Sequence, residues 1–477
     1  MSKHCDLLVI GSGPAGQKAA IQAAKGGMQV IVCEQLREIG GACVQYGTIP
    51  SKSLRERAMA RAAVFASGFV DQQRKPTLAN TNVAELIGEM DDILRAHDCY
   101  MTEQLQRNGI ELLHGRARFS DTHTAMVQNN KGQDTEVAFK HALIATGSTP
   151  RQPDNVPIDQ EHILDSDSIL NMAYLPESLV VLGGGVIACE YASIFALLGV
   201  KVTILDRYAR PLGFLDEELT DHFLEGFASF NGEFIGEREL LSVELNDLGR
   251  VVTHLHGEKA IESDKLLCAL GRVSTLAGLG CEAIGIDVTE RDHVAVNEHG
   301  QTSLPHIYAA GDAVGPPALA SASMEQGRRA ARHMLGLDSG AGVGLVPTGI
   351  YAVPELSCVG LTQTQAEAAG HDVLVGTARF SEVARGHIAD AREGLLKMVA
   401  DRSGRLLGIH IVGPQATELV HIGQMALLHE ANITLFIDNV FNFPTYAEAY
   451  RVAALTISGQ VIKAAEKTSG DDSQAVA

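Results

Sequence analysis

Two glycine-rich turns in this chain have the spacing of a loop that binds a dinucleotide. The first, Gly11-Ser-Gly-Pro-Ala-Gly16, follows the apolar run 7–10, and the second, Gly183-Gly-Gly-Val-Ile-Ala188, follows the apolar run 178–182. In such a loop the first glycine permits a tight turn, and the second lets the backbone approach a pyrophosphate. The third, where alanine is also accepted, lets a helix pack closely on the preceding strand. The chain is therefore expected to hold two dinucleotides.

An acidic residue ends the next apolar run after each turn, Glu34 in the first case and Asp206 in the second. An acid at this place accepts hydrogen bonds from ribose hydroxyls. Asp206 favours the 2′-hydroxyl of NAD, whereas Arg207 and Arg210 directly after it are suited to a 2′-phosphate. A preference for NAD is expected, and use of both nucleotides stays open.

The chain has 477 residues, which suggests about three domains. Its 38 Lys and Arg against 58 Asp and Glu give a net charge of −20, so a nucleic-acid-binding surface is not expected. With 45% hydrophobic residues and 48 glycines, the composition is typical of an α/β enzyme.

No targeting, membrane or metal signal accompanies the two turns. The first strand begins almost at the first residue, which leaves no room for a signal peptide, and the long apolar region 178–205 is interrupted by Glu190. The eight cysteines form no C-x-x-C pair, and the 18 histidines show no ligand spacing. A cytoplasmic protein with no membrane partner and no metal site is expected.

Further strands and helices surround the two turns. Strands that close on glycine are expected at 141–147, 266–272 and 307–312, with a helix from about 319. Residues 55–140 are expected to hold helical stretches and one short strand, and the region after about 345 to form a separate α+β domain. Two dinucleotide units in one chain indicate a flavoprotein that also binds a nicotinamide nucleotide.

Over residues 5–465 the sequence resembles the pyridine-nucleotide disulfide oxidoreductase family. The resemblance rests on both glycine turns and on five further motifs: Gly40-Gly41, Ile49-Pro-Ser-Lys52, Ala145-Thr-Gly147, Ala310-Gly-Asp312 and Pro444-Thr-Tyr-Ala-Glu448. It implies an α/β fold with two Rossmann-like dinucleotide-binding domains, for FAD and NAD(P), and a C-terminal α+β dimerisation domain.

The same resemblance implies domain boundaries. An FAD-binding domain takes residues 1–150 and continues, as the central domain, over 276–345. The NAD(P)-binding domain takes 151–275, and the dimerisation domain takes 346–465. The polar tail 466–477 is expected to be disordered. A homodimer or a higher assembly of dimers is the expected oligomer.

The chain departs from the pattern of the family it resembles at the residues that reduce disulfides there. Cys43 is present, but Thr48 stands where the family has a second cysteine, and Phe443 stands where it has a general-acid histidine. Glu448 orients that histidine in the family; here this role is expected to be lost, and a helix-capping or interface carboxylate is the alternative role. Both losses, together with motifs such as Gly47-Thr-Ile-Pro-Ser-Lys52, resemble one branch, the soluble, Si-specific, FAD-containing pyridine nucleotide transhydrogenases. That resemblance implies a ping-pong hydride transfer from NADPH through FAD to NAD⁺, with NAD(H) and NADP(H) as substrates.

Lys52 and Glu190 are the catalytic residues that the resemblance implies. In the family this lysine supplies positive charge near the flavin ring and pairs with the glutamate. Asp312 is expected to bind the ribityl hydroxyls. The full set of expected cofactor-binding residues is Gly11, Gly13, Gly16, Glu34, Gln35, Gly40, Gly41, Cys43, Thr48, Lys52, Gly115, Thr146, Gly147, Gly183, Gly185, Ala188, Glu190, Asp206, Arg207, Gly271, Asp312, Leu319 and Ala320.

Three alternatives remain open from the sequence. The main one is an NADH-preferring diaphorase, quinone reductase or NADH oxidase, which Asp206 favours. A second is a nucleotide-sensing or scaffolding flavoprotein without turnover, which the retained Lys52 and Glu190 argue against. A third gives Cys43 a redox role through a sulfenic acid, although its neighbours include no base or partner thiol.

Overall fold

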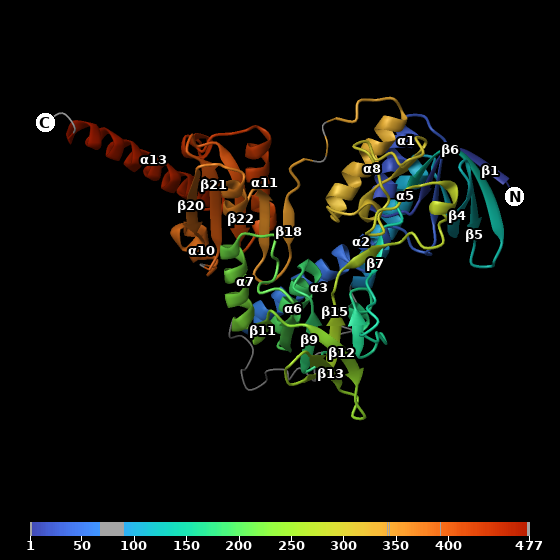
Figure 1. Cartoon of the computed structure of the whole chain (residues 1–477), viewed down its shortest axis with the longest axis horizontal. Coiled ribbons are helices and arrows are strands. Elements are labelled where there is room, and N and C mark those ends of the chain that lie inside the picture. The colour runs from blue at the N-terminus through green and yellow to red at the C-terminus, as the bar shows by residue number, and fades with distance from the viewer. Residues whose placement is uncertain (1, 67–89, 341, 343, 392, 475–477) are drawn as a thin grey trace. The chain divides into compact units, whose positions relative to one another are not determined.

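The computed structural model describes residues 2–66, 90–340, 342, 344–391 and 393–474 (Figure 1). These residues form two units. The first unit contains the described residues of three segments, which are 2–60, 90–175 and 268–344. The second contains the segments Pro176–Leu267 and Leu345 onward, together with the end of the helix that includes Arg61. Each unit is described separately below.

The first unit is organised around a seven-stranded sheet whose centre is parallel. β1 pairs in parallel with β2 on one side and with β6 on the other, β3 extends the β2 side, and β17 pairs in parallel with the end of β6. The carboxyl ends of these strands therefore meet at one edge, where α/β proteins bind nucleotides. The strand bounds are β1 Ser2–Ile10, β2 Val30–Glu34, β3 Glu111–His114, β6 Asp134–Ile144 and β17 Ile307–Ala309.

Two antiparallel strands extend the sheet beyond β6. β4 (Arg116–Asp121) pairs with β5 (Thr124–Gln128), which pairs with β6. The expectation of helices and one short strand over 55–140 is wrong on this point. The sequence does alternate here between apolar and polar residues, as in a half-buried strand. In the structure the apolar Ala117 and Phe119 are buried, and their neighbours in the strand are exposed.

Three helices cover one face of the sheet, and their bounds are α1 Pro14–Lys25, α5 Met90–Arg107 and α8 Ala320–Met334 (Figure 1). Leu7 and Val9 of β1 point to this face, whereas Leu8 and Ile10 point to the core on the opposite face. α1 and α8 approach closely, because a Cβ on Gly327 would lie 2.1 Å from the Ala15 carbonyl oxygen.

The second unit contains the second glycine turn. Its parallel strands follow the order β11-β10-β9, with β15 next to β9, and α6 (Val186–Leu197) and α7 (Glu217–Ser229) belong to the same region. The strand bounds are β9 Ser178–Leu182, β10 Lys201–Leu205, β11 Gly232–Ile235 and β15 Lys265–Cys268. A small antiparallel sheet follows β11, formed by β12 Leu240–Leu245, β13 Val251–Leu255 and β14 Ile261–Ser263.

The rest of the second unit is an α+β region with an antiparallel sheet in the order β18-β19-β22-β21-β20. Its core includes Phe380 and Tyr450, both fully buried. The bounds are β18 Thr348–Ile350, β19 Leu356–Gly360, α9 Gln363–Ala368, β20 Val373–Arg379, α10 Ala384–Ile388, β21 Leu395–Asp401, β22 Leu406–Val412, α11 Ala416–Leu428, α12 Thr434–Ile437 and α13 Glu448–Gln474. The expected polar tail from 466 thus begins within α13, and its last three residues lie outside the described part of the chain.

The α/β class and both strand–turn–helix–strand units are confirmed. The unit boundaries after Leu175 and Leu267 fall inside the expected 151–275 domain. The domain division therefore stays a prediction. Among the described residues, no helix has both the length and the apolar character that crossing a membrane requires.

Candidate dinucleotide sites

The first glycine turn is packed so tightly that two of its positions have no room for a side chain. Gly11 has φ +105°, and a Cβ there would lie 2.2 Å from the Ala145 carbonyl oxygen at the end of β6. A Cβ on Gly16 would lie 1.9 Å from the Gly11 oxygen. Both residues bring the start of α1 against the edge of the sheet.

Gly13 differs from Gly11 and Gly16, because a Cβ at this position would not clash with any protein atom. It is the N-cap of α1 with φ −65°, and a Cβ there would be 3.9 Å from the Cα of Gly41. No side chain caps this helix N-terminus. Its free N–H groups and partial positive charge therefore fit a dinucleotide diphosphate.

The Glu34 carboxylate at the end of β2 is held by the glycine turn itself. Its Oε2 accepts hydrogen bonds from Ser12 N at 3.0 Å and Ser12 Oγ at 2.7 Å, and its Oε1 accepts one from Leu36 N. Ser12 Oγ also accepts a bond from Gly40 N at 3.0 Å. Ser12 thus connects Glu34 to the start of the next helix. Sequence reasoning missed Ser12, although a hydroxyl inside a glycine turn that precedes a strand-ending acid was an available signal.

Gly115 and Gln35 lie beside Glu34 in different ways. Gly115 N donates to the Glu34 carbonyl oxygen at 2.8 Å, and a Cβ on Gly115 would lie 2.6 Å from the Gln128 oxygen, so packing requires this glycine. Gln35 is exposed directly after β2.

A polar atom without a partner marks the same edge of the sheet after β6. Thr146 Oγ1 is buried and makes no hydrogen bond. Gly147 (φ +69°) and Gly271 (φ +101°) have no atom within 4 Å of an added Cβ, which leaves room beside the backbone. An orphaned hydroxyl and open glycines fit a bound ligand at this edge.

Asp312 lies after β17, on the short helix Gly311–Val314. Its Oδ2 accepts a hydrogen bond from Ser148 Oγ at 2.5 Å. α8 follows, with Leu319 as its N-cap and Ala320 as its first residue, and no side chain caps it. The structure thus brings the expected residues of the first unit to one edge of one sheet.

Cys43 lies in α2 (Gly41–Gln45), and Thr48 begins α3 (Thr48–Ala66). Burial raises the pKa of the Cys43 thiol, although a hydrogen bond with Thr48 and the charge of Lys52 oppose that rise. All eight cysteines are free. Lys52 is half-buried on α3, and its Nζ donates to Ser51 Oγ at 3.3 Å.

The second glycine turn repeats the geometry of the first. Gly183 has φ +102°, Gly185 is the N-cap of α6 without a side-chain cap, and Ala188 is fully buried in that helix. A Cβ on Gly185 would have no atom within 4 Å. This helix N-terminus fits a second diphosphate.

Glu190 is buried on α6, where its Oε1 accepts a hydrogen bond from Tyr351 N at 2.9 Å. The carboxylate therefore holds the start of the C-terminal part of its own unit. The expected pairing of Glu190 with Lys52 would join the two units, and it stays a prediction.

The residues after β10 separate into different roles. Asp206 accepts a hydrogen bond from Tyr208 N, and its Oδ2 would lie 2.4 Å from a Cβ on Gly184, so the carboxylate packs against the glycine turn. Arg210 forms an ion pair with Asp221. The Arg207 guanidinium lies 4.8 Å from the centre of the Tyr208 ring.

Phe443 and Glu448 occupy the positions of the family's proton-transfer residues, and metal binding is a separate question. Phe443 is 69% exposed, and the Glu448 carboxylate accepts a hydrogen bond from Thr445 N, which is a helix-capping contact. Among the described residues, no group of three or more His, Cys, Asp or Glu side chains is placed to hold a metal ion.

Comparison with known families accounts for this arrangement. Residues 5–327 match the model for pyridine nucleotide-disulphide oxidoreductases, and residues 346–454 match that family's dimerisation domain. The chain belongs to this family. The resemblance stated from the sequence is confirmed.

Relatives within the family agree over almost the whole chain. Soluble pyridine nucleotide transhydrogenases of Mycobacterium bovis and Mycobacterium tuberculosis are 40% identical over 96% of this chain and 98% of their own length. That of Vibrio atlanticus is 40% identical over 95% of this chain and 98% of its own.

Two solved structures share the fold of this chain. LpdA from Mycobacterium tuberculosis matches with a TM-score of 0.87 at 26% identity, over 95% of this chain and 99% of its own. The HOCl-induced flavoprotein disulfide reductase RclA from Escherichia coli matches with a TM-score of 0.85 at 25% identity, over 95% of this chain and all of its own.

Proposed function

We propose that this protein is an FAD-dependent, Si-specific NAD(P)⁺ transhydrogenase that moves hydride between NADPH and NAD⁺ without a redox-active disulfide. The observation that carries the proposal is the environment of Cys43, whose side chain shares a hydrogen bond with Thr48, where the family has a second thiol. The names and near-complete coverage of the relatives support the same activity.

Residues of the first unit supply the proposed FAD site. The uncapped start of α1 at Gly13 would hold the diphosphate, Glu34 a ribose, and Asp312 hydroxyls of the ribityl chain. Lys52 would stabilise the negative charge that develops when hydride arrives. When bound, FAD accepts a hydride from one nicotinamide and gives it to another.

Residues of the second unit supply the proposed nicotinamide nucleotide site. The uncapped start of α6 at Gly185 would hold the diphosphate, and Asp206 the adenosine ribose. One such site in the chain requires the two nucleotides to bind in turn, so the proposed kinetic order is ping-pong. Arg207 would contact the 2′-phosphate of NADP(H).

Asp206 favours a second candidate, an NADH-preferring diaphorase, quinone reductase or oxidase. A carboxylate beside the adenosine ribose repels a 2′-phosphate. This candidate keeps the same FAD site and changes the electron acceptor.

The deciding experiment compares acceptors with purified, FAD-loaded protein. NADPH is supplied with thio-NAD⁺, and in parallel with lipoamide or oxidised glutathione. The proposal expects rapid thio-NADH formation, parallel double-reciprocal plots and no disulfide reduction. Oxidation of NADH alone, by quinones or oxygen, would instead establish the second candidate.

Arsenite tests the missing dithiol directly, because it binds paired thiols. The NADPH-reduced protein is expected to keep its activity in arsenite. Thr48→Cys, which places a second thiol beside Cys43, is expected to make the protein arsenite-sensitive. Thr48→Ser is the matched control, since it changes the residue without adding a thiol.

We also propose that the protein forms a homodimer through its C-terminal region. The match to the dimerisation domain supports this, as do exposed apolar side chains there, among them Met425, Leu428, Phe443 and Leu455. Sedimentation equilibrium would give twice the 50.8 kDa chain mass, and a monomer at micromolar concentration would contradict the proposal.

A further inference from the structure

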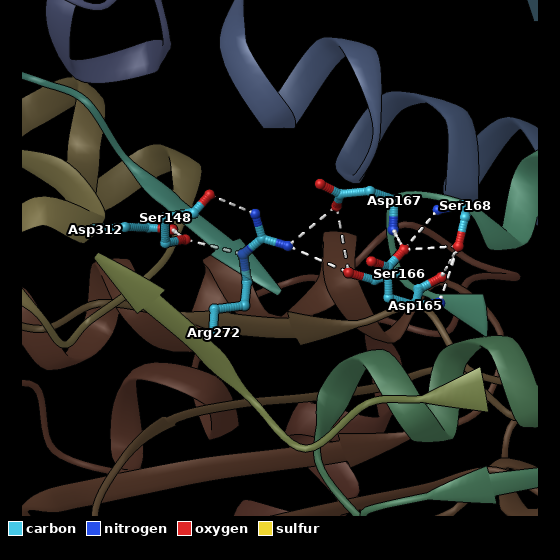
Figure 2. A network of polar contacts seen from close by, with 7 residues as sticks. All are labelled: Ser148, Asp165, Ser166, Asp167, Ser168, Arg272 and Asp312. Atoms are coloured by element: carbon cyan, nitrogen blue, oxygen red, sulfur yellow. Dashed lines mark hydrogen bonds and ion pairs between the residues drawn. The ribbon is translucent and has the colours of Figure 1, made fainter. Parts of the chain in front are cut away.

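The Arg272 side chain contacts two segments of the first unit, one at Ser148 and one at Ser166, which lie 124 and 106 residues before it in the chain (Figure 2). On one side its Nε donates to Ser148 Oγ at 2.9 Å, and its Nη2 donates to the Ser148 carbonyl oxygen at 2.6 Å. On the other side its Nη1 donates to Ser166 Oγ at 3.2 Å and lies 3.4 Å from Asp167 Oδ1. The planar guanidinium therefore donates hydrogen bonds to both segments at once.

The Ser148 hydroxyl passes this constraint on to Asp312. A serine hydroxyl has one proton and two acceptor positions. Because Arg272 Nε donates to the oxygen, the proton is available for Asp312 Oδ2, which lies 2.5 Å away. The Ser148 hydroxyl therefore holds the Asp312 carboxylate by its Oδ2 atom.

The backbone keeps Ser148 and Arg272 in register. β7 (Ser148–Pro150) pairs antiparallel with β16 (Arg272–Ser274). Ser274, on the same strand as Arg272, donates from its Oγ to the Asp312 carbonyl oxygen at 3.1 Å. β16 therefore holds Asp312 by its backbone through Ser274 and by its carboxylate through Arg272 and Ser148.

A rigid turn supports the opposite side of the guanidinium. The buried Asp165 Oδ1 accepts hydrogen bonds from Asp167 N, Ser168 N and Ser168 Oγ, at 3.1, 2.9 and 2.7 Å. Asp167 is presented to Arg272 by this turn. Burial raises the pKa of the Asp167 carboxyl, and the Arg272 charge opposes that rise. Arg272 is anchored at this end by an acid that needs a positive partner.

We propose that Arg272 is a positioning residue for the cofactor: acting through Ser148, it orients the Asp312 carboxylate toward the hydroxyls of the FAD ribityl chain. The inference rests on the proposed function for its ligand. It adds Ser148 and Arg272 to the part of the FAD site that binds the ribityl hydroxyls, for which the sequence had indicated Asp312.

The test must separate orientation of Asp312 from simple bracing of the fold. Ser148→Ala removes the link to Asp312 but keeps the bonds of Arg272 to the Ser148 backbone, Ser166 and Asp167. Asp167→Asn weakens the anchor and keeps the link. The readouts are the dissociation constant of FAD from the apoprotein, by fluorescence titration, and the thermal midpoint of the apoprotein.

Ser148→Ala is expected to weaken FAD binding by about tenfold, the scale of one lost hydrogen bond to a charged group, with little change in the apoprotein midpoint. Asp167→Asn is expected to lower the midpoint with a smaller effect on FAD. Arg272→Lys, which lacks the fork, should weaken FAD binding as Ser148→Ala does. Arg116→Met, which removes an exposed arginine bonded to the Ala277 carbonyl oxygen, is the control expected to change neither quantity.

A double variant tests whether Ser148 affects FAD binding through Asp312. If Ser148 acts through Asp312, Ser148→Ala combined with Asp312→Asn should bind FAD no more weakly than Asp312→Asn alone. Additive losses, or an unchanged FAD affinity for Ser148→Ala, would overturn the inference. Absence of FAD binding by the unmodified protein would instead overturn the proposed function, so the two failures are distinguishable.

Discussion

Lys397 Nζ lies 2.8 Å from Asp216 Oδ1, and both side chains are almost completely buried, with 8% and 5% exposed. Lys397 belongs to β21 in the C-terminal sheet, and Asp216 is the N-cap of α7. The ion pair therefore attaches the N-terminus of α7 to the C-terminal region within the second unit.

Removing one partner of this pair should be costly. Lys397→Met leaves the Asp216 charge buried without its partner, and a loss of about 3–5 kcal/mol is expected for a broken buried pair. The measurement is the urea unfolding transition of the whole protein, which circular dichroism follows.

Two variants control this experiment. Lys397→Met combined with Asp216→Asn removes both charges and keeps a good N-cap residue, so it should recover part of the loss. Arg402→Met, which breaks the exposed pair with Asp372, should leave the midpoint almost unchanged. Equal midpoints for Lys397→Met and Arg402→Met would show that the buried pair adds nothing.

His410 should make stability depend on pH. It is fully buried, and burial lowers its pKa, with Lys397 adding to the fall and Asp216 and the Leu361 carbonyl oxygen opposing it. Below about pH 6.5 the unfolded chain takes up a proton that the folded chain refuses, so stability falls as the pH is lowered through this range.

His410→Gln removes this titration and should flatten the fall in the unfolding midpoint between about pH 6.5 and pH 5. The matched control is His387→Gln at an exposed site of the same unit, where the slope should persist. An unchanged slope in His410→Gln would assign the pH dependence to other groups.

The first glycine turn offers a test of ligand approach against packing. Gly16→Ala would place a Cβ 1.9 Å from the Gly11 oxygen, so misfolding is expected. Gly13→Ala meets no protein atom closer than 3.9 Å and has a φ that alanine accepts. Gly13→Ala should therefore fold and lose FAD affinity by at least about tenfold, because its Cβ occupies the space of the diphosphate.

Circular dichroism of the apoproteins and FAD titration separate the two effects. Gly213→Ala serves as a control for the substitution itself, since this glycine of the second unit has no positive φ and no atom lies within 4 Å of an added Cβ. Full FAD affinity in Gly13→Ala would contradict the proposed placement of the diphosphate.

Arg207 should decide the use of NADPH. Among the described residues it has no acidic partner within ion-pair distance, whereas Arg210 is paired with Asp221. Arg207→Ala should raise KM for NADPH by about tenfold or more, the scale of a charge-assisted hydrogen bond, and leave KM for NADH unchanged. Arg210→Ala is the comparison variant, and a larger NADPH effect there would reverse the assignment.

The sequence by itself determined the two glycine turns and the order of strands and helices around them, and it predicted the loss of the disulfide chemistry. Gly11, Gly13, Gly16 and Glu34 could be assigned because each role follows from local spacing within one strand–turn–helix–strand unit. The same local reasoning failed for β4 and β5, because the alternation in both strands is short and β4 carries the charged Arg116 and Arg118 on its exposed face.

Only the tertiary structure decided which distant side chains share a contact. Ser148 and Arg272 are 124 residues apart, and Asp216 and Lys397 are 181 apart. No spacing rule connects such pairs, because their separation in the chain has no period. They meet because strand pairing and core packing bring their backbones together, and burial then makes each hydrogen bond or charge partner necessary.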